Sequence, residues 1–218
     1  MAIKPILFNT EMVQAILGGR KSCTRRLVKY EPQGYFEVNE NPVYIYDTDW
    51  NQGRIKPPYQ PSDILYVRET FIQAAAHIFW YKADDKPWMS KGLRWKPSIH
   101  MPKEAARIWL KVTDVRVERL QEITEVQAQA EGIRGYSKDG NLYKYAVTDD
   151  WWIDFHNKHR KSFFGGTWWQ DMPRTAREAF SYLWNSTIKK SDLDRYGWDA
   201  NPWVWVIEFE RCEKPEGV

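Results

Sequence analysis

The 218-residue sequence contains few cysteines and no long apolar run. Its two cysteines, Cys23 and Cys212, are too few for a disulfide framework, which is typical of chains in a reducing compartment. The first residues, Met-Ala-Ile-Lys-Pro, are too short and too polar for a signal peptide, and no stretch suits a membrane span. We therefore expect a cytoplasmic protein that is not inserted in a membrane. Cys23 fits a small, half-buried residue better than a nucleophile.

Signatures of several enzyme classes are also missing. The sequence has no Walker-type phosphate loop, dinucleotide fingerprint, nucleophile elbow or kinase signature, so these classes are set aside. His156 and His159 form an i, i+3 pair if residues 151–159 are helical, but no cysteine or acidic partner follows at ligand spacing. We expect no metal site and no cofactor.

Positive and negative charges nearly balance, whereas aromatic residues are abundant. The net charge of +3 is well below the charge typical of a protein that binds nucleic acid strongly. Thirteen tryptophans and twelve tyrosines contribute to an aromatic content of 16%. Many of these rings can be core or interface anchors, yet the surplus also fits stacking on planar ligands such as nucleobases.

Strands dominate the predicted secondary structure, with helices interspersed irregularly. Buried strands are predicted at 64–67, 108–117 and 203–209, and helices at 124–131 and after Pro173. The apolar positions of the second strand change parity at Thr113-Asp114, which indicates a bulge or bend. This order predicts an α+β fold around a small mixed β-barrel rather than a doubly wound parallel sheet. We expect one domain over 1–218, with aromatic-rich insertions at about 30–60, 73–94 and 134–170.

The densest group of reactive side chains follows a short predicted helix that Thr10 can cap and that a glycine pair, Gly18-Gly19, ends. Beyond the glycines the chain is expected to be extended, so Thr24 and Arg26 share one strand face, while Lys21 lies at the bend. An amine, a hydroxyl and a fixed cation are thus close together. A solvated basic turn is the alternative interpretation.

Glu131 is unusual because it lies in the last turn of a predicted helix. Thr124 and Gln127 form a capping box at the start of this helix, and Gly132 ends it. A carboxylate at a helix C-terminus is disfavoured by up to about 1 kcal/mol, which favours proton uptake and fits a role in proton transfer. Without further evidence, an ordinary exposed glutamate is the alternative.

Four sequence blocks resemble the ASCH family of the PUA-like superfamily, in particular a long variant common in phages and prophages. The blocks are Lys4 to Arg26 with its G-R-K-x-x-T-x-R motif, Pro61 to Glu69, Trp95 to Gly132, and Phe180 to Arg211. Ser62 stands where a glycine is usual in the family. The resemblance implies a small barrel flanked by helices, with a cleft between the Lys21–Arg26 segment and the helix that ends at Glu131.

A compact branch of this family removes the acetyl group of N4-acetylcytidine with a lysine, a threonine and a glutamate. Lys21, Thr24 and Glu131 match those positions by motif context, so the resemblance implies that these three are catalytic. The candidate substrate contacts are Arg26, Tyr66, Arg68, Glu69, Trp95 and His100. His100 lies in a predicted loop between two prolines. Trp80 is a further candidate for stacking on the base.

Three functions are weighed. The first is an amidohydrolase for N4-acylated cytosine nucleosides, the second a non-catalytic RNA- or DNA-binding module of phage origin that recognises a modified base. The third is a phage structural or host-takeover protein that kept the fold without the chemistry. The Lys-Thr-Glu set favours the first, since a pure binder needs no such set, and the insertions and aromatic surplus support the second.

Overall fold

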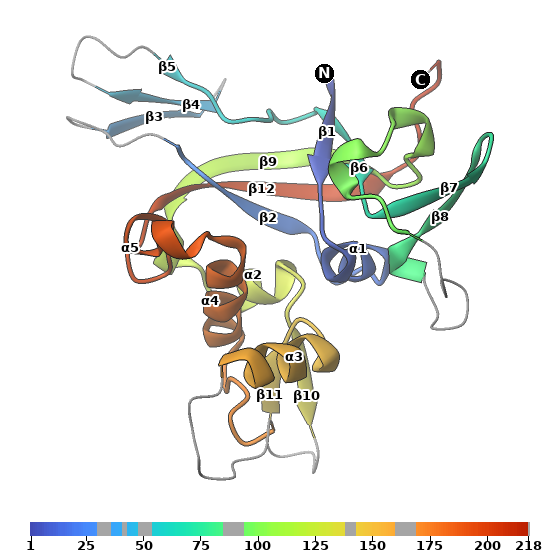
Figure 1. Ribbon diagram of the computed structural model, residues 1–218. Helices are drawn as coiled ribbons and strands as arrows, with labels where there is room; N and C mark the ends of the chain where they lie inside the picture. Colours follow the sequence, from blue (N-terminus) through green and yellow to red (C-terminus); the bar gives the residue numbers. More distant parts are fainter. Residues whose placement is uncertain are drawn as a thin grey trace.

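Five strands that are far apart in the sequence form the main sheet of the computed structural model (Figure 1). The structure describes residues 1–29, 36–40, 43–47, 54–84, 94–137, 143–159 and 169–217. The parallel pair β1–β6 lies at one side, and all other neighbours are antiparallel. In spatial order the strands are β1 (Ile3–Leu7), β6 (Ile64–Arg68), β9 (Trp109–Arg119), β12 (Trp203–Cys212) and β2 (Cys23–Leu27).

This sheet is open, whereas the sequence predicts a closed barrel. The α+β class is confirmed, but among the described residues β1 and β2 are edge strands that do not pair with each other. A side chain spans the gap instead, since Arg26 Nη2 donates to the Leu7 carbonyl oxygen at 3.1 Å. The space between the two edges therefore stays available for a cavity.

The long strand β9 has the irregularity that its sequence predicts. Asp114 pairs with Glu208 and Val112 pairs with Phe209, so Thr113 is the additional residue of a bulge. The bulge explains the change in parity, because one extra residue moves the following side chains to the opposite face. Val112 and Val115 can thus both lie in the core.

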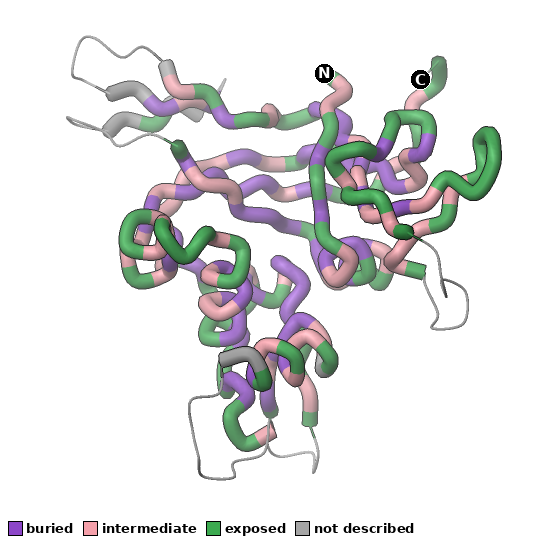
Figure 2. Tube along the Cα trace, viewed as in Figure 1, coloured by how far each residue is buried: buried purple, intermediate pink, exposed green. Residues whose placement is uncertain are grey.

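Helices cover one face of the sheet, and buried side chains fill the space between the two layers (Figures 1 and 2). The predicted capping box is confirmed, with the Thr124 hydroxyl accepting from the Gln127 N–H. The cap of the first helix is Asn9 rather than Thr10, since Asn9 Oδ1 accepts from the Met12 N–H at 2.9 Å. The helices on this face are α1 (Thr10–Leu17), α2 (Glu125–Ala130), α4 (Ala176–Thr187) and the short α5 (Leu193–Tyr196).

The expected insertion segments contain small sheets of their own. Trp152, from the helix Asp149–His159, is buried with Ala146 and Met172 in a smaller core of its own. Parts of each segment lie outside the described residues. The elements are β3 (Phe36–Glu40), β4 (Val43–Asp47) and β5 (Arg54–Ile55), then β7 (Phe71–Ala75) and β8 (Ile78–Tyr81), then β10 (Arg134–Ser137), β11 (Tyr143–Ala146) and α3 (Asp149–His159).

Candidate active site

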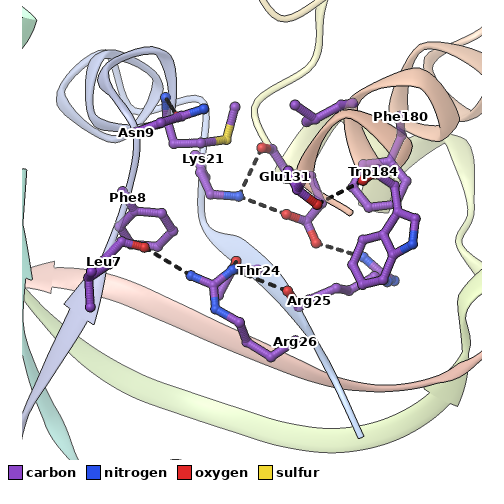
Figure 3. A pocket seen from close by; sticks show the side chains of 13 residues that line it. Leu7, Phe8, Asn9, Lys21, Thr24, Arg25, Arg26, Glu131, Phe180 and Trp184 are labelled. Carbon is purple, nitrogen blue, oxygen red and sulfur yellow. Dashed lines mark hydrogen bonds and ion pairs between the residues drawn. The ribbon is translucent and has the colours of Figure 1, made fainter. Parts of the chain in front are cut away.

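A cavity of about 200 Å³ lies between the two edge strands of the main sheet and the helices below them (Figure 3). Its walls come from the end of β1 and the start of α1, from Lys21 and β2, from the end of α2 and from α4. We call this space the inner cavity. It is lined by Leu7, Phe8, Asn9, Met12, Lys21, Thr24, Arg25, Arg26, Glu131, Phe180, Leu183, Trp184 and Thr187.

Lys21 is a buried cation whose donors all have acceptors. Its side chain is 1% exposed, and Nζ donates to the Cys23 carbonyl oxygen at 2.7 Å. Nζ also donates to the Glu131 carbonyl oxygen at 2.9 Å and to Glu131 Oε2 at 2.7 Å. Burial lowers the pKa of Lys21 below its usual value, although the Glu131 carboxylate partly offsets this effect. The amine is therefore easier to deprotonate than a surface lysine.

Glu131 reaches Lys21 because α2 ends beside β2. Lys21 and Glu131 form an isolated antiparallel bridge, and the Ser22 N–H donates to the Ala130 carbonyl oxygen at 2.9 Å. Gly132 follows with a φ of +104°, and a Cβ built there would lie 3.0 Å from Cβ of Ala15 in α1. Only glycine combines this backbone with so close an approach, so it fixes where the helix ends.

Arg25 holds the other oxygen of the same carboxylate. Its fully buried side chain donates from Nη1 to Glu131 Oε1 at 3.2 Å and from Nη2 to Glu118 Oε2 at 3.2 Å. Its guanidinium lies over the ring of Phe180, 5.8 Å from the centroid. Glu131 thus lies between two cations, Lys21 and Arg25, inside the protein. The sequence did not mark Arg25 as a site residue, although Arg25 lies within the Lys21–Arg26 segment.

Thr24 has a hydroxyl that accepts one hydrogen bond and keeps its own proton. Arg26 Nη1 donates to Thr24 Oγ1 at 3.0 Å, as expected for two residues on one strand face. Since a guanidinium cannot accept, the Thr24 proton is free of this contact. The Arg26 guanidinium also lies over the Phe8 ring, 5.4 Å from its centroid. Sequence reasoning did not find Phe8, because no motif marks it.

Cys23 lies between these residues in the chain but does not line the inner cavity. Its side chain packs in the main core, 3% exposed, so it is more buried than the sequence suggests. Burial raises the pKa of the Cys23 thiol to about 12. A thiol with this pKa stays protonated at neutral pH and is a poor nucleophile.

Five of the predicted substrate contacts lie elsewhere, since they do not line the inner cavity. The Tyr66 ring packs beside Trp109 at 6.0 Å between centroids. Arg68 Nη2 donates to the carbonyl oxygen of Ile99. The remaining three are Glu69, which pairs with Arg107, Trp95, whose ring lies under Lys82, and His100, which is exposed in a single 3-10 turn. The structure therefore gathers Lys21, Thr24, Arg26 and Glu131 and leaves these five apart.

Within the described ranges, no group of three or more histidine, cysteine, aspartate or glutamate side chains is arranged to hold a metal ion. His156 Nε2 lies 2.7 Å from Asp171 Oδ2, far along the chain from the inner cavity residues of β2. No helix in the described part of the chain is long and apolar enough to cross a bilayer.

No protein-family model and no curated protein matches the chain. Among solved structures, it is similar to the crystal structure of an ASCH domain from Lactobacillus crispatus JV V101. The two share 12% sequence identity with a TM-score of 0.35, and the match covers 96% of this chain and 79% of that one.

Proposed function

We propose that this chain hydrolyses the amide bond of N4-acylated cytosine nucleosides at the inner cavity. The observation that carries this proposal is the convergence of Lys21, Thr24, Arg26 and Glu131 on one cavity, with a buried Lys21–Glu131 ion pair at its wall. A hydroxyl beside a buried amine and a fixed cation is the set that acyl transfer needs. A protein that only binds RNA has no need of the buried amine.

The first step forms a tetrahedral intermediate. Thr24 Oγ1 attacks the amide carbonyl carbon, and its proton passes to the Lys21 amine. The reactive amine is the neutral form of Lys21, which burial favours by lowering its pKa. The carbonyl oxygen takes up the negative charge, which Arg26 stabilises by donating hydrogen bonds.

The second step releases cytidine and restores the enzyme. The tetrahedral intermediate collapses, the C–N bond breaks, and the Lys21–Glu131 pair returns a proton to the exocyclic nitrogen. Water then attacks the threonine ester and gives up a proton to the same pair. The bond between the acyl carbon and Thr24 Oγ1 breaks, the pair passes that proton to Oγ1, and the carboxylic acid leaves. Arg25 keeps Glu131 in place throughout, because it binds the carboxylate oxygen that Lys21 does not use.

The test is hydrolysis of N4-acetylcytidine, followed by loss of the absorbance of the acylated base. Thr24→Val, which keeps the shape and removes the hydroxyl, is expected to lower kcat by about 10³-fold or more. Thr24→Ser retains the nucleophile and is expected to retain measurable turnover.

Ser22→Ala is the matched control, since Ser22 is an exposed hydroxyl residue of the same segment that does not line the cavity. Circular dichroism melts establish that each variant is folded. If wild-type protein shows no turnover above background, or if Thr24→Val is as active as wild type, the proposal is wrong. Salt-sensitive binding of RNA or DNA without turnover would then favour the binding-module alternative.

A further inference from the structure

We propose that a second hollow beside the inner cavity binds phosphate, so that the substrate is an N4-acylated cytidine nucleotide rather than the bare nucleoside. The phosphate belongs to a free nucleotide or to the backbone of a nucleic acid. This inference builds on the proposed hydrolysis and names the substrate class of that site.

The second hollow has a volume of about 580 Å³ and shares a wall with the inner cavity. The shared wall consists of Arg25, Arg26, Trp184 and Thr187. Lys29 and Lys56 lie on the part that the inner cavity does not reach. We call this hollow the outer groove. Lys21, Thr24 and Glu131 line the inner cavity but not the outer groove, so the reactive groups lie away from the groove.

The charge of the outer groove is of one sign. Its described lining includes the cations Arg25, Arg26, Lys29 and Lys56 and no carboxylate. Arg25 is neutralised by its ion pairs with Glu131 and Glu118. Lys29 and Lys56 are exposed and form no ion pair within the described part of the chain. A groove whose described lining is cationic, with exposed lysines, is complementary to phosphate.

The shape of the substrate matches this arrangement. In cytosine, the glycosidic nitrogen lies across the ring from the carbon that carries the N4 amide. When the amide carbonyl is at Thr24, the sugar therefore points away from Lys21 and Glu131. The outer groove adjoins the cavity without including those residues.

The size of the inner cavity supports the same division. Pockets for drug-sized ligands hold about 300–1,000 Å³, whereas the inner cavity holds about 200 Å³. A pyrimidine with a short acyl group suits this volume, so the sugar and phosphate have to lie in the outer groove. Tyr59 and Trp205 line that groove and offer apolar surface to the sugar.

Binding of unacylated products tests the groove without any chemistry. We expect cytidine 5′- or 3′-monophosphate to bind the full chain on the order of tenfold more tightly than cytidine in isothermal titration calorimetry, the effect of one charged hydrogen bond. Rising salt should weaken binding of the monophosphate more than that of cytidine. A trinucleotide with a central cytidine distinguishes the two phosphate sources. Tighter binding of the trinucleotide assigns the groove to a nucleic acid, and equal binding assigns it to a free nucleotide.

The double variant Lys29→Gln/Lys56→Gln is expected to abolish the advantage of the nucleotide. The control Lys111→Gln/Lys214→Gln removes the same net charge from exposed lysines that do not line the groove. Equal affinity for cytidine and its monophosphates would overturn the inference. So would an equal loss of affinity in both double variants, because the effect would then be one of net charge.

Hydrolysis of N4-acetylcytidine and its monophosphates separates this inference from the proposed function. Absence of hydrolysis for every substrate contradicts the proposed function, while the binding comparison still decides the groove. Hydrolysis that is equally efficient with nucleoside and nucleotides leaves the function standing and overturns the inference.

Discussion

Glu131 and Glu69 are both buried glutamates that pair with cations, yet their surroundings differ. Arg107 binds both oxygens of Glu69 through Nε at 2.9 Å and Nη2 at 3.0 Å, and it also pairs with Asp84. Burial raises the pKa of Glu69, and the Arg107 guanidinium partly offsets this effect. The guanidinium of Arg107 thus binds both oxygens of the Glu69 carboxylate in a bidentate pair.

Glu131, by contrast, shares its oxygens between Lys21, which precedes β2, and Arg25, which lies in β2, and the two cations bind different oxygens. The lysine can lose a proton, whereas a guanidinium cannot. The pair also faces a cavity that contains a hydroxyl. Glu131 therefore differs from Glu69 in having a partner that can titrate and a cavity beside it.

The largest difference in activity is expected when either glutamate is replaced by the uncharged glutamine. Glu131→Gln is expected to lower kcat for N4-acetylcytidine by about 10²–10⁴-fold, as for loss of a proton-transfer group. Glu69→Gln is expected to lower it far less, because Glu69 does not line the inner cavity. Assays of both purified variants check this.

Urea denaturation of the same two proteins provides the control for folding. Leaving Lys21 and Arg25 without their carboxylate is expected to cost about 3–5 kcal/mol of unfolding free energy. If Glu69→Gln loses as much activity as Glu131→Gln at comparable stability, Glu69 contacts the substrate after all, as the sequence predicts.

A smaller effect is expected from the glycine that places Glu131. Gly132→Ala forces a methyl group against Ala15 at a positive φ, and should lower the free energy of unfolding by about 2–3 kcal/mol. Gly19→Ala is the matched control, because Gly19 has a φ of +70° and open space around it. It should cost about 1 kcal/mol. Equal losses would show that the contact with Ala15 contributes nothing.

The smallest expected effect is a shift of the pH dependence. In the proposed mechanism neutral Lys21 is the base, so kcat/KM should rise with pH and level off above the Lys21 pKa, which burial holds below its ordinary value of 10.5. The Glu131 carboxylate raises the pKa of Lys21. In the residual activity of Glu131→Gln, the rise of kcat/KM should therefore occur at lower pH than in wild type. A rise that moves to higher pH, or an activity that falls with pH, would contradict the role of Lys21 as base.

Local signals in the sequence predicted local structure correctly. The Thr124–Gln127 capping box and the bulge at Thr113 involve neighbours in the chain or a change of parity within one strand. The cap of α1 was misassigned, because Asn9 and Thr10 are adjacent and both suit a cap. Strand pairing is not local, and for this reason the open edges of β1 and β2 were not foreseen.

The candidate site was predicted only in part, for similar reasons. Motif context was sufficient to bring Lys21, Thr24 and Glu131 together. Alternation along β2 placed Arg25 on the face away from Thr24, but its long side chain in an edge strand still reaches the end of α2. An aromatic surplus carries no information on position, so it could not distinguish Tyr66 from Trp184, which does line the cavity.

The bridge between Lys21 and Glu131 joins residues that are 110 positions apart, and the expected insertions at about 30–60 and 73–94 lie between them. Closing a loop of this length carries an entropy cost that grows only with the logarithm of its length, about 0.6 kcal/mol for each doubling. Segments between the two halves can therefore lengthen, shorten or be exchanged at little thermodynamic cost to the bridge. The two halves of the site can stay constant while the intervening chain diversifies.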